Sequence, residues 1–88
     1  MNLIGAELRN QRESKDWSQD DLARRCQLMG WDISRETVTR IETRQRLVSD
    51  YEVCLLAVAL GIDAHKLIPS SPDLSGYLRA KPLDSGKG

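Results

Sequence analysis

The 88-residue sequence predicts an all-α fold, a compact domain of five short helices followed by a disordered tail. Phe is absent, so the core must come from Leu, Ile, Val and Ala, of which Leu and Ala favour helices. Apolar residues recur at intervals of three or four, and no segment alternates as a strand does. The length suits one small domain, expected at residues 1–68, with the tail at residues 69–88.

The first helix is expected at about residues 3–15, where Ile4 and Leu8 lie four positions apart on one face. Ser18, with Asp21 three residues later, forms a capping box that begins the second helix. The inward face of this second helix is expected to hold three residues: Leu22, Ala23 and Cys26.

The third helix is expected to begin near Ser34, after Gly30 provides a left-handed stop for the second. Its apolar positions are few: Ile33, Val38 and Ile41. The rest of its surface carries Ser, Arg, Glu and Thr. A helix with a thin apolar stripe and a wide hydrogen-bonding face suits a groove of DNA.

A second capping box, Ser49 with Glu52, begins the fourth helix, and Gly61 ends it. Asp63 is expected to cap a short fifth helix that contributes Leu67 and Ile68 to the core. The residues that follow are rich in Ser, Pro and Gly, a composition typical of a disordered tail.

Formal net charge is zero, which argues against a general affinity for polyanions. Basic residues are concentrated locally, with four arginines against two glutamates in residues 35–46.

No apolar run reaches the roughly 18 residues that span a membrane, and no signal peptide is evident, so a cytoplasmic protein is expected. Cys26 and Cys54 lack metal-ligand spacing and are expected to be buried free thiols.

The ordered set of motifs resembles the phage-repressor and Cro type of helix-turn-helix domain, the Xre-like family. Over residues 4–68 the matching features are Leu8 and Arg12, then the runs WSQDDLA (17–23), SRETVTRIE (34–42) and LAVALGI (56–62). The resemblance implies a compact five-helix, lambda-repressor-like domain whose third helix contacts bases in the major groove of double-stranded DNA.

Three departures from the family pattern stand out. The connection between the second and third helices is several residues longer than the usual turn, so either the second helix gains a turn or the connection bulges. Arg44 stands where the family often has Gly, which implies a reshaped end of the third helix and an additional phosphate contact. Val48 stands where the family has Pro, a milder change.

The resemblance places base contacts on the third helix, at Arg35, Glu36, Thr37, Thr39 and Arg40. Arginine donates to guanine O6 and N7 together, so Arg35 and Arg40 are the best candidates. Glu36 either accepts from cytosine N4 or screens Arg40, four residues on. Phosphate contacts are expected from Gln19, Ser34, Thr43, Arg44 and Arg46. The alternative for the whole face is an ordinary solvated helix surface.

The resemblance also implies a structural ion pair between Arg12 on the first helix and Glu42 on the third. If the pair is partly buried, loss of one partner costs roughly 3–5 kcal/mol. Two independent surface charges, the alternative, are worth about 0–1 kcal/mol as a pair. Trp17 is expected to pack against the core, whereas Trp31 either covers the end of the core or forms a partner surface.

The resemblance implies a homodimer, since family members often dimerise through the fourth and fifth helices. The inward stripe of the fourth helix is Val53, Leu56, Ala57 and Leu60, and four apolar residues lie off it and could form a patch: Tyr51, Cys54, Leu55 and Val58. Such dimers set two recognition helices about one DNA turn apart, roughly 34 Å, and bind palindromic operators. Isolated exposed apolar residues without a partner are the alternative.

The sequence therefore predicts a sequence-specific transcriptional regulator that binds double-stranded DNA. A phage or mobile-element repressor, a restriction-system controller and an antitoxin all fit. The rival is a protein-interaction module that keeps the scaffold without binding DNA, which zero net charge and Glu36 favour. No phosphate loop, nucleophile arrangement or ligand spacing is present, so no enzyme activity, cofactor, metal or small-molecule ligand is expected.

Overall fold

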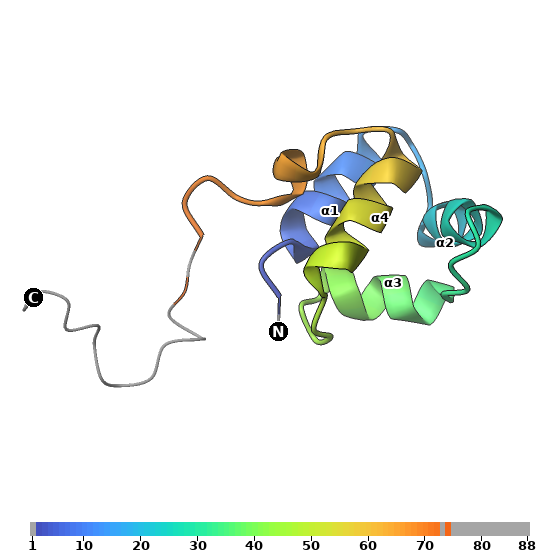
Figure 1. The fold of residues 1–88 in the computed structure, drawn as a ribbon, viewed down its shortest axis with the longest axis horizontal. Coiled ribbons are helices and arrows are strands. Elements are labelled where there is room, and N and C mark those ends of the chain that lie inside the picture. The colour runs from blue at the N-terminus through green and yellow to red at the C-terminus, as the bar shows by residue number, and fades with distance from the viewer. Residues whose placement is uncertain (1, 73, 75–88) are drawn as a thin grey trace, which may run out of the picture.

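In the part of the chain that the structure describes, four α-helices and one short 3-10 helix surround an apolar core (Figure 1). The structure, a computed structural model, describes residues 2–72 and residue 74. Its elements in chain order are α1 (Gly5–Glu13), α2 (Gln19–Leu28), α3 (Arg35–Glu42), α4 (Asp50–Leu60) and the 3-10 helix η1 (Ala64–Leu67). All regular secondary structure in this part of the chain is helical, which confirms the predicted fold class.

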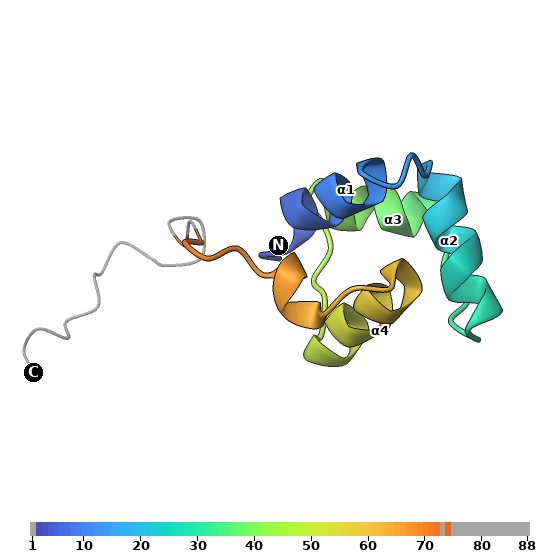
Figure 2. The same cartoon turned by 90° about the horizontal axis from the view of Figure 1, so that it is seen from above.

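The five elements pack as a closed ring. The principal contacts of α1 are with α3 and η1, those of α2 are with α3 and α4, and α4 also packs on η1. In Figure 2, α1 and α3 lie on one side of the core and α4 on the other, with α2 and η1 closing the two ends. Because α3 packs against both α1 and α2, its position is fixed by two neighbours.

The apolar stripes predicted from the sequence form the core. Its buried members from the first three predicted helices are Ile4, Leu8, Leu22, Ala23, Cys26, Ile33, Val38 and Ile41. The last two elements contribute Leu56, Ala57, Ala59, Leu60 and Leu67. Trp17 and Trp31 are both half-buried and pack against this cluster, as expected for the first and as one of the two alternatives for the second.

Both predicted capping boxes form. Ser18 Oγ accepts from the Asp21 amide, and the Asp21 carboxylate accepts from the Ser18 amide at 2.7 Å. This backbone hydrogen bond lowers the pKa of Asp21 below its ordinary value. Ser49 and Glu52 make the same reciprocal bonds at the start of α4, and Gly61 ends that helix in the left-handed region with φ 72°.

The added residues between α2 and α3 lie mainly in the connection, which bulges over residues 29–34. Gly30 adopts φ 99°, and Gln27 Nε2 donates to the Ile33 carbonyl oxygen at 2.7 Å. Ile33 is buried but precedes α3, so the third helix itself contributes only two apolar residues to the core.

Several sequence expectations are wrong in detail. The first helix is shorter than residues 3–15, and the fifth is a single 3-10 turn that Asp63 does not cap with its side chain. Ile68 is 50% exposed, so it is not a core residue. Cys54 is exposed, because it lies on the outer side of α4. Cys26 is buried as predicted, and desolvation raises the pKa of its thiol to about 11.

The predicted tail begins after η1 without regular structure in residues 69–72. Most of its remainder lies outside the described residues. Over the part of the chain that the structure covers, none of the helices has the length and apolar character needed to cross a membrane.

Gly5 marks a close approach between α1 and the end of α3. A Cβ atom at this position would lie 2.6 Å from the carbonyl oxygen of Ile41 and 2.8 Å from that of Glu42. Both neighbours are backbone atoms, which cannot rotate away as a side chain does. Glycine is therefore required for the first turn of α1 to contact α3 at this separation.

We predict that Gly5→Ala lowers the free energy of unfolding by about 1–3 kcal/mol, because the added methyl overpacks the α1–α3 contact. Glycine replaced by alanine in an unobstructed helix stabilises by roughly 0.5–1 kcal/mol, so the expected sign is reversed. Denaturant unfolding measures the change, with Asn10→Ala on the exposed side of α1 as the control. A more stable Gly5→Ala variant would contradict the close approach.

Candidate nucleic-acid interface

The outer face of α3 is polar and open. Ser34 caps the helix by accepting from the Thr37 amide at 3.2 Å. Val38, Ile41 and Glu42 are the buried residues of the helix. In Figure 1, α3 runs along the lower edge of the domain with the other helices above it. The exposed side chains of the helix, those of Arg35, Glu36 and Arg40, lie on a surface that a flat or grooved partner can approach.

The two arginines predicted to contact bases are exposed. The Arg35 and Arg40 side chains are 66% and 60% exposed, respectively. Arg35 Nε lies 3.8 Å from Asp20 Oδ1, and Arg40 Nη2 lies 3.5 Å from Glu36 Oε2. Exposed ion pairs of this kind contribute about 0–1 kcal/mol, so neither guanidinium is withheld from a ligand.

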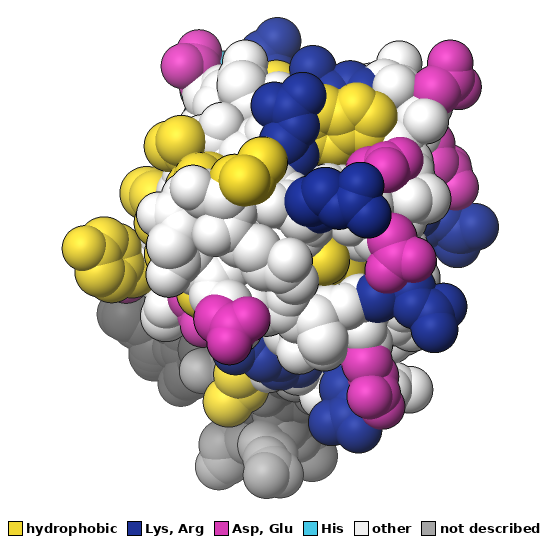
Figure 3. Space-filling model, turned by 90° about the vertical axis from the view of Figure 1, so that its right-hand side faces the viewer, with side chains coloured by type: hydrophobic (Ala, Val, Ile, Leu, Met, Phe, Trp, Pro, Cys, Tyr) yellow, Lys and Arg dark blue, Asp and Glu magenta, His cyan; other side chains and the backbone are white. Residues whose placement is uncertain are grey.

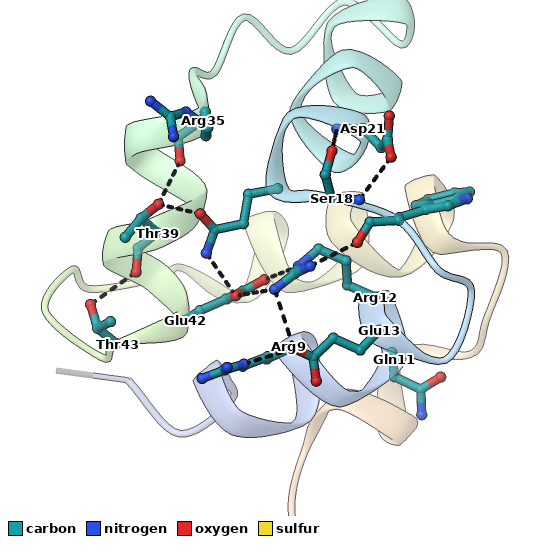
Figure 4. Close-up of polar contacts among 12 residues, drawn as sticks. Arg9, Gln11, Arg12, Glu13, Ser18, Asp21, Arg35, Thr39, Glu42 and Thr43 are labelled. Carbon is teal, nitrogen blue, oxygen red and sulfur yellow. Dashed lines mark hydrogen bonds and ion pairs between the residues drawn. The ribbon is translucent and has the colours of Figure 1, made fainter.

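A buried ion pair joins the other face of α3 to α1 (Figure 4). Arg12 Nε and Nη2 donate to the two carboxylate oxygens of Glu42 at 2.7 and 2.9 Å, and both residues are buried. Arg12 Nη1 donates to the carbonyl oxygen of Trp17 at 2.7 Å. The hydrogen bonds that Arg12 donates to Glu42 raise the pKa of its guanidinium. The pair thus ties α3 to α1 and to the residue that precedes the α2 capping box.

Gln19 extends this network to the start of α2. Its Nε2 donates to Glu42 Oε1 at 3.0 Å, and its Oε1 accepts from the Thr39 hydroxyl at 2.6 Å (Figure 4). Because a side-chain amide carries two N–H donors, one of them stays available to a ligand. The half-buried Thr39 therefore lies at the α2–α3 contact, where it orients Gln19.

The residues after α3 that were predicted to contact phosphates already form hydrogen bonds within the protein. Thr43 Oγ1 donates to its own helix at the Thr39 carbonyl, 2.9 Å away. Arg46 makes a bidentate pair with Glu52, both distances being 3.1 Å, and this pair lowers the pKa of the Glu52 carboxyl. Arg46 thereby helps to fix the first turn of α4.

Arg44 adopts a left-handed backbone conformation, with φ 65°. Glycine takes this conformation without steric cost, which explains physically why the resembling domains favour Gly at this position. The Arg44 side chain offsets the cost of this backbone conformation, since its Nε donates to the Asn2 carbonyl oxygen at 2.9 Å.

Asn2 is a structural residue that the sequence analysis missed. It is buried, and its Oδ1 accepts from the amides of Ile4 and Gly5 at 3.1 and 2.9 Å. Its Nδ2 donates to the carbonyls of Ile41 and Arg46 at 3.1 and 2.8 Å. One side chain thus caps α1 and holds the end of α3. The available signal was weak, namely that Asn favours positions before a helix.

Opposite charges alternate on the face at the α2 end of the domain. Figure 3 shows Lys and Arg side chains next to Asp and Glu there, without a broad region of one sign. The basic and acidic side chains of this neutral chain are therefore intermixed on this face. Across residues 2–72 and 74, His, Cys, Asp and Glu side chains form no group of three or more that suits a metal ion.

We predict that Arg12→Met lowers the free energy of unfolding by roughly 3–5 kcal/mol, because it leaves the Glu42 carboxylate buried without its cation. The double variant Arg12→Met with Glu42→Leu should lose less than the sum of the two single losses, which denaturant unfolding measures. Arg9→Ala breaks an exposed pair with Glu13 and should cost at most about 1 kcal/mol. Additive losses at positions 12 and 42 would show that the pair is not coupled.

Comparisons with known proteins agree with this architecture. A family model described as a helix-turn-helix domain matches residues 3–67. Among solved structures, the chain is similar to the crystal structure of a hypothetical transcription factor, NHTF, from Neisseria. The two share 28% sequence identity with a TM-score of 0.66, over 76% of this chain and 71% of that one. The search of curated proteins gives no match.

The chain belongs to the helix-turn-helix domain family, in line with its resemblance to Xre-like domains.

Proposed function

We propose that this protein is a transcriptional regulator that binds double-stranded DNA in a sequence-specific manner, with α3 in the major groove. The observation that carries the proposal is the division of α3 into two faces. One face is held by a buried ion pair to α1, and the other exposes Arg35 and Arg40. The helix-turn-helix family and the likeness to a hypothetical transcription factor support DNA binding.

In the proposed complex, Arg35 and Arg40 donate to guanines, and Glu36 and Thr37 meet neighbouring base edges. Thr39 acts mainly by orienting Gln19. The second Nε2 hydrogen of Gln19, at the first turn of α2, donates to a phosphate. Helix N-termini favour such anions because their backbone N–H groups are unpaired.

The residues at the two ends of α3 supply further phosphate contacts. Ser34 and Thr43 carry exposed hydroxyls on either side of the groove-facing surface. Arg44 and Arg46 reach the backbone by exchanging their present partners, the Asn2 carbonyl and Glu52, for phosphate oxygens. Since both arginines start from protein partners, each gains less on binding than an unpaired arginine does.

The α4 helix supports a homodimer. Its outward residues Tyr51, Cys54, Leu55 and Val58 follow the i, i+3, i+4, i+7 spacing of one helix face. Tyr51 and Val58 are 74% and 66% exposed. The opposite side of α4 is buried in the core, so the helix is apolar on both sides. We propose that a second copy covers the outer side, which sets two α3 helices on a palindromic operator.

Repression is the regulatory outcome we propose. A protein bound across an operator blocks access to that DNA without further activity. A phage or mobile-element repressor, a restriction-system controller and an antitoxin share this mode of action.

A protein-interaction module on the same scaffold is the second candidate. The observation in its favour is that Asp20 and Glu36 neutralise the two exposed arginines of α3. Dependence on salt separates the candidates, because DNA binding releases counterions.

We predict that selection from a random duplex pool yields a preferred operator. Log affinity should fall with log salt with a slope of about −2 per subunit, if Arg44 and Arg46 each neutralise one phosphate. Negligible affinity for every duplex at low salt would contradict DNA binding.

Arg40→Ala should lower the preference for the operator over a duplex with one altered guanine by about 1–3 kcal/mol. Arg9→Ala is the matched control, since Arg9 also forms an exposed i,i+4 pair but lies on α1. Competition binding with the altered duplexes measures both. An equal effect of the two variants would refute the assignment of Arg40 to a base.

Val58→Glu should convert the dimer to a monomer, because it places a charge within the proposed apolar interface. Light scattering measures the state, and affinity for the palindromic operator should fall by about a hundredfold as bivalent binding is lost. Leu47→Glu is the control, since Leu47 is also largely exposed but lies before α4. A monomeric wild-type protein on DNA would rule out the dimer.

A further inference from the structure

We infer that Asp20 is a positioning residue for DNA recognition, which holds Arg35 through Nε and directs its two terminal nitrogens toward a guanine. The inference rests on the proposed function and deepens it. It concerns a carboxylate on α2 that acts through a base-contacting arginine on α3.

The pair connects two helices. Asp20 Oδ1 lies 3.8 Å from Arg35 Nε, and both side chains are about two-thirds exposed. Asp20 follows Gln19, whose amide is bonded to Glu42 and Thr39. The bonds of Gln19 fix the first turn of α2 against α3, so the position of the Asp20 backbone relative to α3 is set by the fold.

The atom that Asp20 approaches matters for recognition. A guanidinium has five N–H donors in one plane, and a guanine needs two of them for O6 and N7. Engagement of Nε leaves Nη1 and Nη2 free at the end of the side chain. An ion pair at Nε also favours the rotamers of Arg35 that keep the two groups close, so the orientation of the side chain is biased before DNA arrives.

Arg40 provides the contrast. Its carboxylate partner, Glu36, lies on the same helix and approaches Nη2, a terminal nitrogen. Glu36 therefore competes with a base for Arg40, whereas Asp20 leaves the base-contacting end of Arg35 unoccupied. The two acidic residues have different effects although both form exposed ion pairs.

Asp20 also repels the DNA backbone. It lies in the first turn of α2, next to the amide that we propose donates to a phosphate. Its negative charge opposes binding to every duplex equally. Removal of the charge should thus strengthen binding to random DNA and weaken the choice of guanine. A residue that acts only through its charge changes the affinity for random DNA and leaves the preference for guanine unaltered.

The test uses the full chain and the operator selected by the wild-type protein. Arg35→Ala identifies the base pair that Arg35 contacts, as the position whose alteration no longer changes affinity. With Asp20→Asn, affinity for random duplex should rise, while preference for guanine at that one position falls by about two- to fivefold. Asp20→Glu, which keeps the carboxylate, should recover part of the preference.

Two controls isolate the mechanism. Asp32→Asn removes the same charge from the exposed connection and should leave the guanine preference unchanged. In the double variant of Arg35→Ala and Asp20→Asn, preference should be no lower than with Arg35→Ala alone, since the carboxylate acts through the arginine.

The outcomes separate this inference from the proposed function. If Asp20→Asn keeps the guanine preference, or loses preference equally at all positions, the inference is overturned while DNA recognition stands. The same holds if Arg35→Ala alters no preference. If the wild-type chain binds no duplex at low salt, the proposed function fails and the inference fails with it.

Discussion

The buried ion pair between Arg12 and Glu42 is the constraint on which the interface depends. A carboxylate at the inner face of α3 is costly to desolvate, and only a well-placed cation with several hydrogen bonds offsets that cost. Arg12 meets this requirement with two bonds to Glu42 and one to the Trp17 carbonyl. An apolar pair would fill the same space without the directional hydrogen bonds that join these three segments.

The scaffold and the candidate interface share side chains. Glu42 accepts from Arg12 on α1 and from Gln19 on α2, so the group that anchors α3 also orients a proposed phosphate contact. A helix of eight residues is not stable by itself in water. Its order comes from these polar bonds and from two buried apolar residues, which keeps its outer side chains in place before DNA binds.

Local signals in the sequence predict most of the fold. Both capping boxes and the apolar stripes depend on residues a few positions apart, and they formed as expected. The interactions that the sequence did not predict join residues far apart in sequence. Asn2 bonds the carbonyls of Ile41 and Arg46, and no local pattern reveals those partners. The partners of Arg44 and Arg46 likewise follow from the packed chain, whereas the pairing of Arg12 with Glu42 came from family resemblance.

The distribution of charge favours selectivity over strong general binding to DNA. Each arginine on the outer face of α3 has a carboxylate within 4 Å, and the chain as a whole is neutral. A duplex that offers only phosphates must displace or repel these carboxylates for little gain. In the proposed complex, a duplex with guanines in register offers directional hydrogen bonds that outweigh the weak exposed pairs with the carboxylates. Arginines that are paired with carboxylates on a neutral surface thus lower the affinity for non-specific DNA more than the affinity for an operator. The ratio of the two affinities, on which selective regulation depends, therefore rises.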